Sequence, residues 1–183
     1  MTPIIEPCRY TTFPSEQDVL TQLLVNAPGS VAIEIGAHEG LTTRVLAPFA
    51  LDAGVEYIVI DPWDGTQDSA GDDCYGIFIQ NTQHLDVGIW RMRSHDATPP
   101  ADLGFVFHDG DHRNPDFQKW WDALIPGGVL VVHDVTEGAG WPAVRAGVDA
   151  LGLPCHEYRY RATPEEALTY GPSTRGLWWK VKP

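Results

Sequence analysis

Short apolar runs and segments of helical period follow one another along most of the chain. The apolar runs have the length of buried strands, and the segments between them repeat apolar residues at helical spacing. The predicted strands cover residues 31–35, 56–61, 89–93, 105–109 and 129–134. The predicted helices cover residues 15–26, 41–49, 75–85, 116–124 and 141–151. Strands that alternate with helices predict an α/β fold with a mostly parallel sheet.

The two ends of the chain depart from this alternation. Residues 1–14 show little periodicity, and we expect a loose lead-in there. The helix that follows opens on a hydroxyl residue with an acid three positions later, the pattern of a capping box. Residues 155–160 and 176–181 predict a closing antiparallel strand pair. No repeat or change of composition marks a boundary, so we predict a single domain over residues 1–183.

Charge and composition exclude several classes of partner. The chain carries 25 acids against 12 Lys and Arg, a net charge of −13, which disfavours nucleic acid as a partner. No apolar run approaches the ~20 residues that span a bilayer, and the amino terminus lacks the pattern of a secretory signal. The three cysteines are widely separated, which favours free thiols in a reducing compartment. We therefore expect a cytoplasmic protein with no membrane partner.

A glycine turn between the first predicted strand and the next helix indicates a small-molecule site. Gly36 and Gly40 bound this turn, and Glu34 is the one acid in the strand before it. Glycines let the backbone approach a ligand closely, and the following helix offers free N–H groups. The spacing is Gly-x-x-x-Gly rather than the Gly-x-Gly-x-x-Gly of dinucleotide sites, which counts against a nicotinamide cofactor. Asp61 ends the second strand 25 positions after Gly36. In nucleotide-binding βαβ units, an acid at the end of the second strand, roughly 20 residues on, binds the two ribose hydroxyls.

Acids recur where the predicted strands end. Asp61, Asp109 and Asp134 each close a strand, and Ser94, His95 and Asp96 follow a fourth. The carboxyl ends of parallel strands line one crevice, so these side chains should meet there. Any one of these acids could instead cap the next helix or turn. Their recurrence favours a functional site.

At four blocks the chain resembles class I S-adenosylmethionine-dependent methyltransferases. More narrowly, it is similar to the catechol O-methyltransferase-like enzymes and to the O-methyltransferases of cephalosporin and macrolide-sugar pathways. The blocks are residues 34–40, 60–62, 107–112 and 126–134. The resemblance implies a Rossmann-like seven-stranded, mostly parallel sheet with helices on both faces and an antiparallel C-terminal strand pair. It also implies methyl transfer to a hydroxyl of a small-molecule acceptor.

The resemblance also implies which residues contact S-adenosylmethionine. Glu34 and the glycine turn would hold the methionine part, whose cationic ammonium suits a carboxylate. Asp61 would take the ribose hydroxyls, and residues 94–96 would contact the adenine. The full set of implied contacts is Glu34, Gly36, Ala37, Gly40, Thr42, Asp61, Ser94, His95, Asp96 and Asp109.

Metal-dependent members of this group add a divalent cation and a base. By resemblance, Asp109, His133 and Asp134 would hold the cation, and His112 would accept the hydroxyl proton. Asp111 is a second candidate base, or an acid that orients His112. Histidine suits Mn²⁺, Fe²⁺ or Zn²⁺ better than Mg²⁺. In the alternative interpretation His133 is a buried, hydrogen-bonded histidine and Asp134 alone faces the site.

Other functions stay open from the sequence. The chain could be a catalytically inactive S-adenosylmethionine-binding module, a metal-independent methyltransferase, or an α/β enzyme with a nicotinamide cofactor. The acceptor pocket would come from the lead-in, the loops at 63–74 and 161–174, and the segment after Asp134. The chain is short for the group, which leaves room for a homo-oligomer whose partner subunit completes the pocket.

Overall fold

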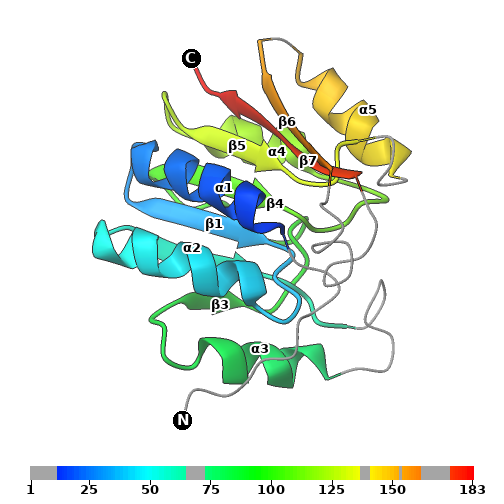
Figure 1. The fold of residues 1–183 in the computed structure, drawn as a ribbon. Coiled ribbons are helices and arrows are strands. Elements are labelled where there is room, and N and C mark those ends of the chain that lie inside the picture. The colour runs from blue at the N-terminus through cyan, green and yellow to red at the C-terminus, as the bar shows by residue number, and fades with distance from the viewer. Residues whose placement is uncertain (1–11, 65–72, 137–140, 153, 162–173) are drawn as a thin grey trace.

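One seven-stranded sheet organises the molecule (Figure 1). The computed structural model describes residues 12–64, 73–136, 141–152, 154–161 and 174–183. The strands are β1 (Val31–Ile35), β2 (Glu56–Ile60), β3 (Gly88–Trp90), β4 (Leu103–His108), β5 (Val129–Val132), β6 (His156–Arg161) and β7 (Thr174–Val181). The helices are α1 (Pro14–Asn26), α2 (Leu41–Asp52), α3 (Cys74–Thr82), α4 (Phe117–Ala123) and α5 (Pro142–Ala150).

The strand order is β3-β2-β1-β4-β5-β7-β6. Strands β1 to β5 pair in parallel, and β7 runs antiparallel to both β5 and β6. Strands β1 and β4 therefore occupy the centre, and their carboxyl ends lie side by side. The predicted fold class, including the antiparallel C-terminal pair, is confirmed.

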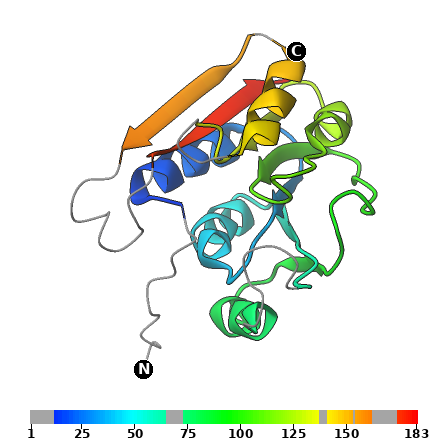
Figure 2. The same cartoon turned by 90° about the vertical axis from the view of Figure 1, so that its right-hand side faces the viewer.

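The sheet is covered on both faces, and alternation along each strand divides the core in two. Helices α1, α2 and α3 pack through residues such as Leu20, Leu46 and Phe78 on one face. Helices α4 and α5 pack through Trp120 and Val148 on the other. Figure 2 shows α1 and α2 on one side of the sheet and α4 and α5 on the opposite side. Because both faces are buried, the central strands are almost uninterrupted apolar runs.

The start of α1 differs from the predicted serine cap. The helix begins at Pro14, and Phe13 is the residue before it. Proline suits the first helical position because its missing N–H needs no partner there. Glu16 reaches back to accept the Phe13 N–H at 2.9 Å. The last part of the expected loose lead-in is thus ordered, since Phe13 is fully buried, whereas residues 1–11 lie outside the described chain.

Two strands, β3 and β5, end two or more residues earlier than predicted. The edge strand β3 ends at Trp90 rather than residue 93, because its partner β2 ends at Ile60 just before Pro62. Strand β5 ends at Val132, two residues before the predicted Asp134. Asp134 has a positive φ of 56°, which an extended strand cannot contain. Asp109, His133 and Asp134 therefore lie just beyond the ends of β4 and β5, where the local backbone sets the direction of each side chain.

Among the described helices, none is both long and apolar enough to cross a bilayer.

Candidate functional site

The glycine turn after β1 is locked against the end of β4. Gly36 has a φ of +85°, and a Cβ on it would lie 2.4 Å from the carbonyl oxygen of Asp109. The Gly36 N–H donates to the carbonyl of Ile60 at 2.9 Å, and the Asp109 N–H donates to that of Ile35 at 2.8 Å. Gly36 is thus required by both its conformation and its contact. The turn fixes where Asp109 lies.

Asp61 lies beside this turn, as predicted, and holds its backbone. Its carboxylate accepts the N–H of His38 at 3.0 Å and the N–H of Trp63 at 2.8 Å. Both donors have a positive φ, 49° and 45°, which is uncommon for residues other than glycine. Burial raises the pKa of Asp61, and these hydrogen bonds partly offset the rise. Asp61 therefore stabilises the turn directly.

The remaining predicted contacts of the turn lie nearby. The carbonyl of Ala37 accepts the N–H of Gly40 at 2.7 Å, which closes the turn. Thr42 is buried in the first turn of α2, and its hydroxyl lies 3.1 Å from the hydroxyl of Thr12. The segment before α1 thus packs against the helix that follows the glycine turn.

Glu34 lies beneath the turn, with no exposed surface. Its Oε2 accepts the Thr43 hydroxyl at 2.6 Å and the Tyr57 hydroxyl at 3.1 Å, while Oε1 has no hydrogen-bond partner among the described residues. Burial raises the pKa of Glu34 from 4.5 to about 8, opposed by the two hydroxyls and increased by the charges of Asp109 and Asp61. Glu34 therefore supports the turn from below, through its hydrogen bonds with Thr43 and Tyr57, and has no side-chain surface on the turn itself.

This environment predicts a pH-dependent gain in stability for Glu34→Gln. The folded-state pKa exceeds the unfolded one, so this group lowers stability as pH rises from about 4.5 to 8. Relative to wild type, the variant should gain up to roughly 4 kcal/mol across that range. Urea unfolding at several pH values measures this difference. The exposed Glu56→Gln is the control, and a Glu34→Gln difference that stays constant with pH contradicts the assignment.

A second group of side chains joins the ends of β4 and β5. Nε2 of His112 lies 3.4 Å from Oδ1 of Asp109 and 3.4 Å from Oδ2 of Asp134. The ring of Trp141 stacks on the His112 ring, with centroids 4.9 Å apart and planes 20° apart. Each of the three polar side chains keeps between 11% and 18% of its surface exposed, while the ring nitrogens of His112 themselves are buried. The predicted meeting of Asp109, His112 and Asp134 is observed.

Charge pairing dominates the electrostatics of this group. Burial alone would lower the pKa of His112, but hydrogen bonding and charge from Asp109 and Asp134 outweigh it and raise the pKa to about 9. Burial alone would raise the pKa of Asp109, yet His133 and His112 hold it well below its usual range. The two histidines also lower the pKa of Asp134 against the effect of burial, so at pH 7 both carboxylates are ionised and His112 carries a proton.

His133 is buried, with one ring nitrogen toward Asp109 and Asp134 and the other toward Glu16. Its Nδ1 lies 3.0 Å from Oδ1 of Asp109, and its Nε2 lies 3.3 Å from Oε2 of Glu16. Both His133 and Glu16 are buried, with side-chain exposures of 1% and 0%. His133 therefore connects α1 to Asp109. This arrangement corresponds to the alternative in which His133 is a buried, hydrogen-bonded residue.

The predicted adenine contacts divide into one buried and two exposed residues. Ser94 is buried and donates its hydroxyl to Asp116 at 3.0 Å, whereas His95 and Asp96 are exposed. Lys119 donates to the backbone carbonyls of Ser94 and His95, each at 2.8 Å. The loop after β3 is thus held by α4.

Asp116 and His108 form a buried pair that the sequence interpretation missed. Nε2 of His108 lies 2.9 Å from Oδ1 of Asp116, and Trp120 donates its Nε1–H to Oδ2 at 3.0 Å. Burial alone would raise the pKa of Asp116, but His108 lowers it to about 2. The signal was available, since alternation along β4 sends His108 to the face opposite Asp109.

Asp111 shapes the loop that carries His112. Its Oδ1 accepts the backbone N–H of Arg113 at 3.2 Å and of Asn114 at 3.1 Å. These contacts fit the predicted role of orienting His112 through the loop. Glu16, in contrast, was missed as a site residue because it lies 117 positions from its partner His133.

The converging residues fit a divalent cation. One ligand atom each from Asp109, His112 and Asp134 lie within 4.8 Å of one another. The two carboxylates can hold a divalent cation, and the imidazole beside them can serve either as a third ligand, which suits Mn²⁺, Fe²⁺ or Zn²⁺, or as a base. Asp61, Asp109 and Asp134 place three carboxylates at the ends of neighbouring strands around this opening. Such a field favours a cationic small molecule over a phosphate.

Comparison with solved structures identifies relatives of the whole fold. The O-methyltransferase TomG from Streptomyces achromogenes, in complex with SAM, matches with a TM-score of 0.66 at 18% identity, covering 94% of this chain and 82% of TomG. An O-methyltransferase from Bacillus cereus in complex with SAH matches with a TM-score of 0.64 at 17% identity, covering 96% and 84%.

A third similar structure is named as a methyltransferase but not as an O-methyltransferase. The C-terminal domain of precorrin-6Y C5,15-methyltransferase from Rhodobacter capsulatus matches with a TM-score of 0.59 at 16% identity, covering 94% of this chain and 91% of that domain.

No curated protein matches the chain. The family model described as a methyltransferase domain matches residues 33–135, more than half of the chain. The chain therefore belongs to the methyltransferase domain family.

Proposed function

We propose that this protein transfers the methyl group of S-adenosylmethionine to a hydroxyl of a small-molecule acceptor. The observation that carries the proposal is the position of His112 between Asp109 and Asp134, beside the turn fixed by Gly36. An imidazole and two carboxylates at the carboxyl ends of adjacent strands supply a proton acceptor and a cation site in one opening. The SAM and SAH of TomG and the Bacillus cereus protein support the choice of cofactor.

The acidic turn suits this cofactor physically. S-adenosylmethionine carries positive charge on its sulfonium and its ammonium, and the carboxylates of Asp61, Asp109 and Asp134 provide a negative field, whereas Glu34 is largely protonated at pH 7. Asp61 uses its carboxylate for two backbone N–H groups, yet each oxygen keeps a second lone pair for a ribose hydroxyl. Ser94, His95 and Asp96 are assigned to the adenine side, where α4 holds the loop.

We assign the cation to Asp109 and Asp134, and the proton acceptor to His112. A divalent cation on the two carboxylates would polarise the acceptor hydroxyl and compensate their charge. His112 is then the neutral base, with Nε2 as the accepting atom and Trp141 fixing its ring plane. His133, predicted as a third ligand, is assigned to positioning Asp109 from its place beside Glu16.

Calorimetry with S-adenosylhomocysteine tests the cofactor assignment without knowledge of the acceptor. We expect saturable binding to the wild type, weakened about 10–100-fold in Asp61→Asn, since a hydrogen bond to a charged group contributes about 1.5–3 kcal/mol. Asp52→Asn, an exposed acid at the end of α2, should bind as the wild type does.

Two outcomes would reject the cofactor assignment. One is the absence of heat at millimolar S-adenosylhomocysteine. The other is an enhancement of NADH fluorescence, which would support the nicotinamide alternative instead. A protein that binds S-adenosylhomocysteine and whose turnover is unaffected by EDTA would be a metal-independent methyltransferase.

A further inference from the structure

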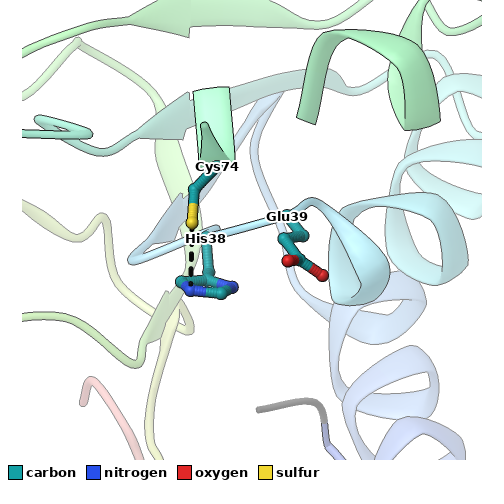
Figure 3. A group of neighbouring side chains, drawn as sticks. All are labelled: His38, Glu39 and Cys74. Carbon is teal, nitrogen blue, oxygen red and sulfur yellow. Dashed lines mark hydrogen bonds between the residues drawn. The ribbon is translucent and has the colours of Figure 1, made fainter. Parts of the chain in front are cut away.

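A second cluster of metal-ligating side chains lies where the glycine turn meets α3. It consists of His38, Glu39 and Cys74, and Figure 3 shows the Cys74 thiol over the edge of the His38 ring with the Glu39 carboxylate beside them. One ligand atom from each residue lies within 4.8 Å of the other two. His38 and Glu39 belong to the turn, and Cys74 is the first residue of α3. The cluster thus joins two segments that are far apart in sequence.

The distance between His38 and Cys74 matches that between two ligands of one small cation. Sγ of Cys74 lies 3.4 Å from Nε2 of His38. A tetrahedral zinc ion, with bonds of about 2.3 Å to sulfur and about 2.0–2.1 Å to nitrogen, places those two ligands about 3.6 Å apart. The two side chains therefore need to move by only a few tenths of an ångström to share an ion.

The backbone of all three residues is held in place independently of any ion. The N–H of His38 donates to Asp61 at 3.0 Å, and its carbonyl accepts Nε1–H of Trp63 at 2.7 Å. The carbonyl of Glu39 accepts the side-chain amide of Asn81 in α3 at 2.7 Å. Cys74 lies in the first turn of α3, where the helix N-terminus stabilises a thiolate. The ligands are thus positioned before a cation arrives, which favours its binding.

We propose that His38, Glu39 and Cys74 form a binding site for a thiophilic divalent cation of the Zn²⁺ type. The sulfur, nitrogen and oxygen donors suit zinc and its transition-metal neighbours and do not suit Mg²⁺ or Ca²⁺. Three protein ligands leave the fourth position to water or to a bound molecule. His38 and Glu39 are partly exposed, so an ion can enter from solvent, while Cys74 is 3% exposed. The site differs from the Asp109 group, which has no sulfur.

Titration with Co²⁺ tests this site, because a cobalt–thiolate bond gives a charge-transfer absorption that oxygen and nitrogen ligands do not. The measurement uses the full chain with Cys8 and Cys155 replaced by serine, so that Cys74 is the remaining thiol. We expect the band to saturate at one equivalent, to disappear in Cys74→Ser, and to persist in Asp109→Asn. Zn²⁺ should displace the cobalt and abolish the band.

His38→Asn provides the second variant, since asparagine tolerates the positive φ of this position while it removes the imidazole. Its cobalt affinity should fall at least about 100-fold, because even losing a residue that only orients a ligand costs ~10–100-fold. Circular dichroism checks that the variants fold, and His38→Asn decides the test if Cys74→Ser does not. No band at millimolar Co²⁺, a band that survives Cys74→Ser, or an unchanged cobalt affinity in His38→Asn overturns the proposal and leaves a plain Cys74–His38 hydrogen bond.

Discussion

Replacing His112 with glutamine should lower kcat by about 10²–10⁴-fold once an acceptor is known, the usual contribution of a positioned general base. Glutamine keeps a polar side chain of similar length between Asp109 and Asp134 but cannot accept the hydroxyl proton. The binding of S-adenosylhomocysteine should change by less than about threefold, because His112 contacts the carboxylates and Trp141 rather than the glycine turn. Steady-state kinetics and calorimetry on the same preparation measure the two effects.

His84→Gln is the matched control for that prediction, because His84 is an exposed histidine between α3 and β3. It should leave both kcat and cofactor binding unchanged. A His112→Gln protein with wild-type kcat would remove His112 from the chemistry and direct attention to a different proton acceptor. A wild-type protein that binds the cofactor but methylates no hydroxylated compound would support the non-catalytic binding module.

Gly36→Ala should destabilise the protein by about 2–5 kcal/mol and weaken cofactor binding at least tenfold. The first part of the cost, about 1–2 kcal/mol, comes from forcing an L-residue to a φ of +85°. The second, about 1–3 kcal/mol, comes from a Cβ that would lie 2.4 Å from the Asp109 carbonyl oxygen. Relief of that clash must move the turn away from the end of β4, and the proposed cofactor site moves with it.

Gly54→Ala separates these two contributions. Gly54 has a similar φ of +73°, and a Cβ there would meet nothing within 4 Å. Its variant should lose only the conformational part, about 1–2 kcal/mol, and bind S-adenosylhomocysteine as the wild type does. Urea denaturation of both variants gives the comparison. Equal losses in the two variants would show that close packing against Asp109 does not constrain the turn.

The sequence predicted those features that depend only on residues close together in the chain, namely the central strands, their ends and the glycine turn. The apolar runs located the central strands, and the ends of those strands located Asp61 and Asp109. The glycine turn was identified because its spacing reflects a backbone geometry that few residues allow. The family resemblance added the identity of the cofactor and placed His112 three residues beyond Asp109.

Other features depended on tertiary packing and were not predictable from spacing. In the sequence, His133 follows the end of a strand, which is where a metal ligand is expected. The direction of its ring, however, depends on a contact with Glu16, which lies beside it only in the folded chain. The pairing of His38 with Cys74 likewise needs α3 to dock beside the turn. Asp134 adopts a positive φ, so its side chain does not follow the alternation of the strand before it.

The contact between Glu16 and His133 has a practical consequence for anyone who redesigns the amino terminus of this protein. Glu16 both accepts the Phe13 N–H and lies against His133, which in turn lies against Asp109. A truncation or fusion that unwinds the first turn of α1 would therefore affect Asp109 through two side chains. Affinity tags and reporter domains belong at the carboxyl terminus, because β7 ends beside Val129, at the opposite end of β5 from His133.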